Sequence, residues 1–197
     1  MATLSVAITF VSCKKGENDP LSLESRKNRL EGYWTLVSGN TLDRYYNAAL
    51  DETQDIVKIV EGETQTSSVI NFTPTGPDTL ATPLTYEYHC EFYFDKKGNF
   101  TSTEVAVTDS LVKNGFWYFT GKNKPLGLKN KEAVEIVITE KYDGSTELFD
   151  GTAMQSDVTW YIDRLAKREL TLLVNVTQSE QNGDFWQTNR VLNFVKY

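Results

Sequence analysis

The segment TYEYHCEFYFD (residues 85–95) contains the chain's only histidine, His89, followed directly by Cys90, one of its two cysteines. A histidine can activate a cysteine nucleophile, and both side chains bind metals. However, apolar and polar residues alternate here, which is typical of a β-strand with one buried face. Since adjacent strand residues point to opposite faces, we expect Cys90 in the core and His89 in solvent. The pattern predicts a structural strand; a surface metal site of His89 with Glu87 and Glu91 is the alternative.

Other catalytic patterns are missing from the sequence. It contains no G-x-S-x-G, P-loop, G-x-G-x-x-G, H-E-x-x-H or C-x-x-C motif. Its 27 acidic residues could bring two carboxylates together for glycoside chemistry, but nothing selects a pair. We therefore expect no enzyme activity, no metal site and no cofactor. A hydrolase is a further alternative.

Composition favours one β-rich domain. The chain has 197 residues, of which 12% are aromatic, and Val, Ile and Thr recur in short runs. Its net charge of −7 disfavours nucleic-acid binding, which needs clustered basic residues. The exception is the lysine-rich segment 121–131, which we interpret as a soluble hairpin loop or, alternatively, as a basic lip that attracts anionic amphiphiles.

Period-two alternation between turn signals predicts about ten strands and no long helix in the body of the protein. Successive antiparallel strands at this spacing are typical of a closed up-and-down barrel or a sandwich. We expect a polar loop at Gly39–Gln54 between the first two strands. The predicted strands are residues 32–38, 55–61, 67–72, 85–95, 98–108, 114–121, 132–139, 157–165, 168–176 and 185–197.

The N-terminal residues 1–12, MATLSVAITFVS, are uncharged, largely apolar and too short to span a bilayer. With Cys13 following, they resemble the signal peptide and lipobox of bacterial lipoproteins, although Phe10 stands where leucine is usual. The resemblance implies an exported protein whose Cys13 is lipidated. Residues 13–30 then form a tether and a short helix, with Asp19 as its cap and Pro20 in its first turn.

Residues 31–197 resemble lipocalin-like outer-membrane lipoproteins of Gram-negative bacteria. The resemblance rests on Gly32-Tyr33-Trp34, which matches the Gly-x-Trp signature of lipocalins, together with the hairpin sequences FDKKGNF and DRLAKREL and the segment NGFWYF. It implies an antiparallel up-and-down lipocalin-like barrel whose base is closed by Gly32 and Trp34. It also implies a basic side chain packed over Trp34, for which Arg190 is the candidate.

The resemblance implies a non-catalytic, monomeric protein that binds or carries a small hydrophobic or amphiphilic molecule and touches the membrane only through its lipid. The alternative is a surface module with a filled barrel, whose 39–54 loop, with Tyr45 and Tyr46, binds a glycan or an envelope protein. Six aromatic residues are candidates for the cavity lining, and ordinary packed core is the alternative for each of them. They are Tyr86, Tyr88, Phe92, Phe94, Trp117 and Trp160.

We expect protein isolated from native membranes to start at Cys13 and to carry a lipid adduct, as measured by intact mass. Cys13→Ser should remove the adduct, whereas the control Cys90→Ser should keep it. A species that starts at Met1 without lipid would contradict the anchor. If the protein is exported without lipidation, a Cys13–Cys90 disulfide is the competing expectation.

Overall fold

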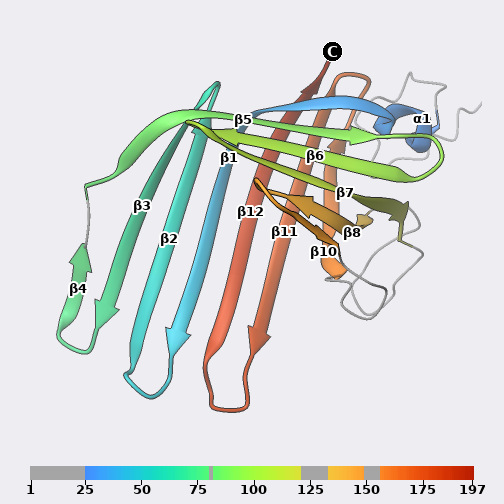
Figure 1. Ribbon diagram of the computed structural model, residues 1–197. Helices are drawn as coiled ribbons and strands as arrows, with labels where there is room; N and C mark the ends of the chain where they lie inside the picture. The colour runs from blue at the N-terminus through green and yellow to red at the C-terminus, as the bar shows by residue number, and fades with distance from the viewer. Residues whose placement is uncertain (1–24, 80–81, 121–132, 149–155) are drawn as a thin grey trace, which may run out of the picture.

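The computed structural model describes residues 25–79, 82–120, 133–148 and 156–197. They form an all-β protein with almost no helix (Figure 1). In chain order the elements are α1 (Arg26–Leu30), β1 (Gly32–Asn47), β2 (Glu52–Glu61), β3 (Thr64–Thr73), β4 (Gly76–Thr79), β5 (Leu84–Phe94), β6 (Asn99–Ala106), β7 (Asp109–Phe119), β8 (Ala133–Tyr142), β9 (Thr146–Leu148), β10 (Ser156–Leu165), β11 (Glu169–Ser179) and β12 (Phe185–Lys196).

Ten of these strands close into one antiparallel barrel. Neighbours in sequence pair around most of the ring, and β12 returns to pair with β1. The ring is completed where β10 pairs with β8. The two short strands β4 and β9 lie outside the ring and pair with β3 and β8. The predicted all-β class and the closed antiparallel barrel are therefore confirmed.

The β2–β3 hairpin makes one end of the barrel wider than the other. At the narrow end β1 pairs directly with β5, from Gly32–Thr35 against Glu91–Phe94. Beyond that point the hairpin lies between the two strands, and the Gly62 amide donates to the Val37 carbonyl at 2.9 Å. Because barrel diameter grows with strand number, the wide end has room in its interior that the narrow end lacks.

The β5 side chains alternate between the inner and outer faces of the barrel, as predicted. Cys90 and Phe92 are buried inside the barrel, whereas His89 is exposed on its outer face. Apolar side chains from six strands and α1 fill the narrow end and exclude water from it. The large apolar side chains with less than 2% exposure are Trp34, Phe94, Phe194, Leu30, Leu165, Leu170, Leu172 and Val134.

The expected loop at Gly39–Gln54 is wrong, because β1 continues to Asn47 and β2 begins at Glu52. Polar residues occupy both faces of the segment 39–54, so this part of the hairpin lacks the hydrophobic period that marks a strand. On its outer face Arg44 forms a bidentate ion pair with Asp55, with both N–O distances at 2.7 Å. Cross-strand pairs of opposite charge stabilise a sheet in place of apolar contacts.

The described part of the N-terminal segment contains one short helix. α1 has five residues and begins after Ser25, whose hydroxyl accepts a hydrogen bond from the Asn28 amide at 3.3 Å. The predicted start at Asp19 lies outside the described residues. So do the predicted signal segment, Cys13 and the lysine-rich segment 121–131.

Gly115 lies at a register shift between β7 and β8, where the two backbones approach closely. A Cβ atom at this position would be 1.9 Å from the Val137 carbonyl oxygen. We expect Gly115→Ala to lower the free energy of unfolding by about 3 kcal/mol, because the strands must separate. Urea unfolding followed by tryptophan fluorescence measures the change.

Gly62→Ala is the matched control. Gly62 has a positive φ of 61°, but a Cβ atom added there would meet no other atom within 4 Å. Only the left-handed backbone strain remains, which costs roughly 1 kcal/mol. Equal destabilisation by the two substitutions would contradict the close approach at Gly115.

Candidate functional site

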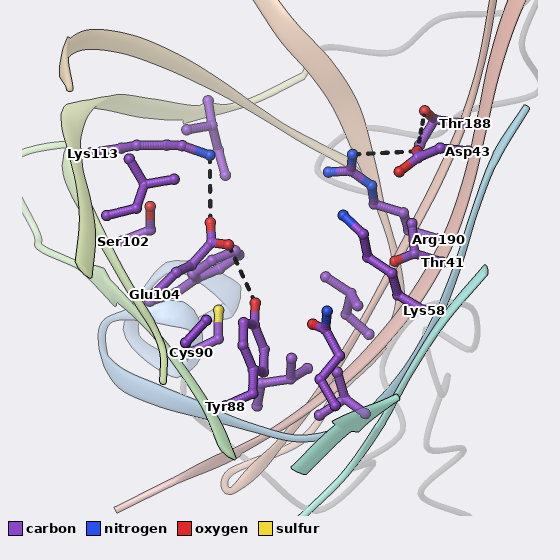
Figure 2. Close-up of a pocket in the computed structure, with 18 of the residues that line it drawn as sticks. Thr41, Asp43, Lys58, Tyr88, Cys90, Ser102, Glu104, Lys113, Thr188 and Arg190 are labelled. Atoms are coloured by element: carbon purple, nitrogen blue, oxygen red, sulfur yellow. Dashed lines mark hydrogen bonds and ion pairs between the residues drawn. The ribbon is translucent and has the colours of Figure 1, made fainter. Parts of the chain in front are cut away.

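A cavity of about 700 Å³ lies within the barrel (Figure 2). Side chains from β1, β2, β3, β5, β6, β7, β8, β9, β10 and β12 line it. Cavities that bind small molecules in proteins commonly have volumes of about 300–1,000 Å³. The barrel is therefore not filled by its own side chains.

The floor of the cavity, next to the narrow end, is apolar. Phe92 lies at its centre and packs against four other rings, of which Phe94, with its centroid 6.3 Å away, belongs to the narrow end. The ring centroids of Phe100, Trp160 and Phe194 lie 5.2, 6.0 and 4.8 Å from that of Phe92. Leu36 completes this surface from β1. Such a floor can accept a hydrocarbon chain or a ring.

Four of the six predicted lining residues lie at the cavity wall, namely Tyr86, Tyr88, Phe92 and Trp160. Phe94 and Trp117 do not. They pack edge to face, with centroids 5.6 Å apart, within the narrow end. There the Trp117 indole donates to the Asp95 carbonyl at 3.1 Å. A role in ligand binding remains a prediction for the four residues at the wall.

On one wall of the cavity, polar groups are mutually satisfied. The Glu104 carboxylate accepts a hydrogen bond from the Tyr88 hydroxyl at 3.2 Å and pairs with the Lys113 ammonium at 3.4 Å (Figure 2). Burial, together with the charge of Glu104, raises the pKa of the Tyr88 phenol. Tyr88 therefore stays protonated and donates a hydrogen bond at physiological pH.

Cys90 lies below this network as a free, buried thiol. Burial raises the pKa of the Cys90 thiol, and the nearby Glu104 carboxylate adds to the effect. Since the thiolate is the reactive form, Cys90 behaves as a small apolar side chain. Because His89 is on the outer face, the two residues form no catalytic pair.

The opposite wall, formed by β1, β2 and β12, carries a second polar group of residues. The Asp43 carboxylate accepts a hydrogen bond from the Thr188 hydroxyl at 2.7 Å. An Arg190 terminal nitrogen lies 3.6 Å from the same carboxylate oxygen. Thr41 and Lys58 lie beside this pair and face the cavity (Figure 2).

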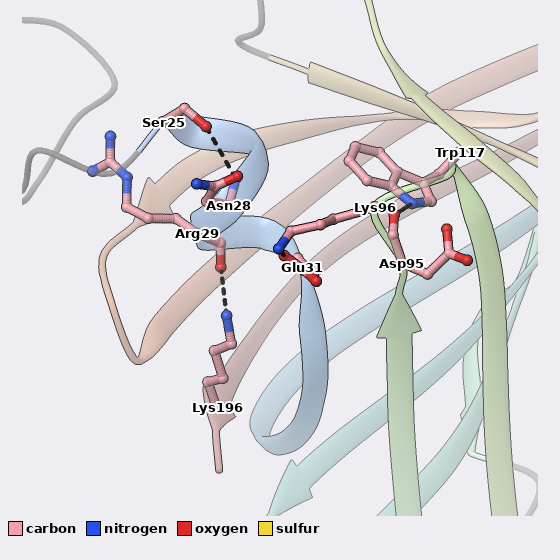
Figure 3. Close-up of polar contacts among 8 residues, drawn as sticks. All are labelled: Ser25, Asn28, Arg29, Glu31, Asp95, Lys96, Trp117 and Lys196. Carbon is pink, nitrogen blue, oxygen red and sulfur yellow. Dashed lines mark hydrogen bonds and ion pairs between the residues drawn. The ribbon is translucent and has the colours of Figure 1, made fainter.

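The prediction that Arg190 covers Trp34 is therefore wrong. The cation over Trp34 is Lys196, whose ammonium lies 5.4 Å from the ring centroid. The same ammonium donates to the Arg29 carbonyl at 3.0 Å (Figure 3). The register of β1 and β12 explains the difference, because it pairs Trp34 with Lys196 and Thr41 with Arg190.

Gly32 and Trp34 do lie at the base of the barrel. The Trp34 ring is fully buried, and its indole donates to the Leu30 carbonyl at 2.7 Å, which joins α1 to the barrel. Gly32 has a φ of 117°, and a Cβ there would be 2.7 Å from the Lys196 side chain. Glycine thus permits both the turn from α1 and the approach of the cation.

The far end of the wide half is held by Asp184, in the turn between β11 and β12. Its carboxylate accepts hydrogen bonds from the Ala48 amide at 2.8 Å and the Tyr45 hydroxyl at 3.1 Å. Tyr46 stacks on Phe185, with centroids 5.1 Å apart. These contacts bind the β1–β2 turn to the β11–β12 turn, so Tyr45 and Tyr46 belong to a packed hairpin rather than to a free loop.

Within the described parts of the chain, no group of three or more His, Cys, Asp or Glu side chains is arranged to hold a metal ion. None of the helices described there is long and apolar enough to cross a membrane.

Fold and site together define an antiparallel β-barrel with an internal cavity, apolar at its floor and charged further out. Comparison with known protein families, with curated proteins and with solved structures found no match to this chain.

Sequence reasoning missed the charged side chains that line the cavity. Asp43 fell in the expected loop, while Lys58 and Glu104 resemble ordinary surface charges of their strands. The available signal was the alternation of side chains along each strand. Lys58 shares a strand face with buried Val60, and Glu104 shares one with buried Ser102. Inward-facing charges at these positions indicate a polar part of the barrel interior.

Asp184 yields a pH-dependent prediction. The hydrogen bond from the Ala48 amide, reinforced by Tyr45 and Asn182, holds the pKa of the Asp184 carboxyl below its usual range. A lowered folded-state pKa adds stability above the unfolded pKa, near 4, and this contribution is lost as pH falls through the folded value. The difference in free energy of unfolding between wild type and Asp184→Asn should therefore be largest near pH 6 and shrink below about pH 4.

Urea unfolding between pH 2.5 and 6.5 measures this difference. Glu180→Gln is the control, because Glu180 lies in the same turn with an exposed side chain. A gap between wild type and Asp184→Asn that stays constant with pH would contradict the assignment.

Proposed function

We propose that this protein binds or carries a small hydrophobic or amphiphilic molecule inside its barrel, without catalysis. The observation that carries the proposal is the 700 Å³ cavity, with Phe92 and Trp160 in its floor and ionisable groups further out. An amphiphile matches this gradient, because its apolar part replaces water at the floor while its head keeps polar contacts.

We also propose that the barrel is lipocalin-like. Gly32 and Trp34 at the base support this proposal, together with a cation over the Trp34 ring and a helix that leads into β1. Lipocalin barrels have eight strands, whereas this ring has ten. The difference equals the inserted hairpin, since β1 pairs directly with β5 at the narrow end, where β2 and β3 take no part.

The absence of catalysis is part of the proposal and is supported by the state of the reactive side chains. Cys90 is held as a thiol by burial. In the cavity wall, Glu104 is paired with Lys113, and Asp43 lies beside Arg190. Both carboxylates therefore have a basic partner of their own.

For location, we propose an outer-membrane lipoprotein exported through residues 1–12 and anchored through Cys13. The support is the sequence of this segment. The tether would join the barrel at α1, beside the narrow end, so the charged part of the cavity would lie away from the point of attachment.

The alternative is a surface module whose loops bind a glycan or an envelope protein. It receives less support, because the barrel contains an open cavity and the segment expected to be the contact loop is mainly β1 and β2. We therefore retain the carrier as the proposed function.

Two neighbouring positions on β6 allow a matched test. Ala106 lines the cavity, whereas Val105 is on the opposite face of the same strand. Ala106→Phe should weaken binding of N-phenylnaphthylamine, an uncharged fluorescent probe, by about tenfold, since the ring occupies ligand volume. Val105→Phe should leave the affinity within about twofold of wild type.

Probe fluorescence and quenching of Trp160 and Trp186, which both line the cavity, measure binding. Thermal unfolding of the two variants controls for damage to the fold. If wild type shows no saturable response to this probe or to fatty acids and alcohols of the same chain length, the proposed function is wrong.

A further inference from the structure

Two basic side chains lie side by side on one wall of the cavity. In the sheet register, Thr41 of β1 pairs with Lys58 of β2 on one side and with Arg190 of β12 on the other. All three therefore share one face, and all three line the cavity. At about 4.8 Å between neighbouring strands, the Cα atoms of Lys58 and Arg190 are roughly 10 Å apart.

Lys58 and Arg190 have hydrogen-bond donors that no described residue uses. Lys58 is half-buried, and its ammonium makes no ion pair or hydrogen bond with any residue that the structure describes. The Nε atom of Arg190 is buried and has no hydrogen-bond partner among the described residues. A terminal nitrogen of Arg190 reaches Asp43, at 3.6 Å, but that carboxylate also accepts the Thr188 hydroxyl.

Two other basic side chains of the cavity have acidic partners of their own. On the opposite wall Glu104 is neutralised by Lys113. Among the described residues, Lys141 is likewise paired with Asp143, at 2.7 Å. Asp43 is therefore the one lining carboxylate on the wall that carries Lys58 and Arg190.

Figure 2 shows Lys58 and Arg190 extending from the same wall toward the interior, with Thr41 between them. An oxyanion placed there would meet an ammonium, a guanidinium and a hydroxyl. Charge-assisted hydrogen bonds of this kind are the strong ones, because the donors are ionised and water is partly excluded.

We propose that Lys58, Thr41 and Arg190 form an oxyanion site and that the head of the ligand is a monoanion, with a carboxylate as the simplest case. This inference rests on the proposed carrier function and specifies its ligand class. The tail lies against Phe92 and Trp160, and the head completes the bonds that Lys58 and Arg190 lack.

The test compares dodecanoate with dodecanol, which share a chain length and differ in charge. Each ligand displaces N-phenylnaphthylamine from the purified full chain at low salt. Wild type should bind dodecanoate about tenfold more tightly than dodecanol. Raising the salt concentration should reduce this preference.

Lys58→Met keeps the length of the side chain and removes its charge. It should weaken dodecanoate binding by about fivefold while dodecanol stays within about twofold. Lys58→Arg should restore dodecanoate binding, and Arg190→Lys should weaken it by removing the Nε donor. Lys167→Met, at an exposed turn position, makes the same change in net charge and should alter neither ligand.

The experiment distinguishes a failure of the oxyanion site from a failure of the carrier function. If both ligands and the probe bind wild type but dodecanoate has no advantage, the oxyanion site is wrong and the carrier function stands. The same conclusion follows if Lys167→Met reduces the preference as much as Lys58→Met does. If nothing binds wild type, the carrier function itself is wrong. The comparison of dodecanoate with dodecanol in wild type tests the oxyanion site even if a variant fails to fold.

Discussion

The insertion of one hairpin between the first strand and its partner determines the form of this protein. Where β1 and β5 pair directly, aromatic and aliphatic side chains meet across the ring and exclude water. Where β2 and β3 separate them, the same interior is too wide for side chains to fill. Core and cavity are thus two consequences of one change in strand number along the barrel axis.

This change in width also explains how charge is accommodated. Near the base, Trp34 and Phe94 are fully buried, and the charged side chains of Arg29 and Lys196 donate hydrogen bonds to backbone carbonyls. Further along, the inner face accepts Asp43, Lys58 and Glu104, since the cavity is large enough for water or for a polar ligand group. Pairing with Lys113 and Arg190 stabilises two of the carboxylates.

Sequence reasoning predicted which face each side chain occupies better than it predicted how far along the barrel it lies. The alternation around Cys90 placed His89 outside correctly, and Gly32 and Trp34 were expected at the base. Alternation along the strand could not show that Phe94 belongs to the core rather than to the cavity, because its position along the barrel depends on the pairing of β5 with β1. For the same reason the cation over Trp34 was predicted to be Arg190: strand register is a tertiary property that a single strand does not encode.

Trp34 and Lys196 also bear on the order of folding. The strands that carry them pair along almost their entire length, yet nearly the whole barrel sequence separates them. Contacts between residues so distant in sequence form slowly, because a long loop must close first. The base of the barrel therefore cannot close until β12 is available. Until then, the apolar faces of the earlier strands stay exposed at the open end of the incomplete barrel.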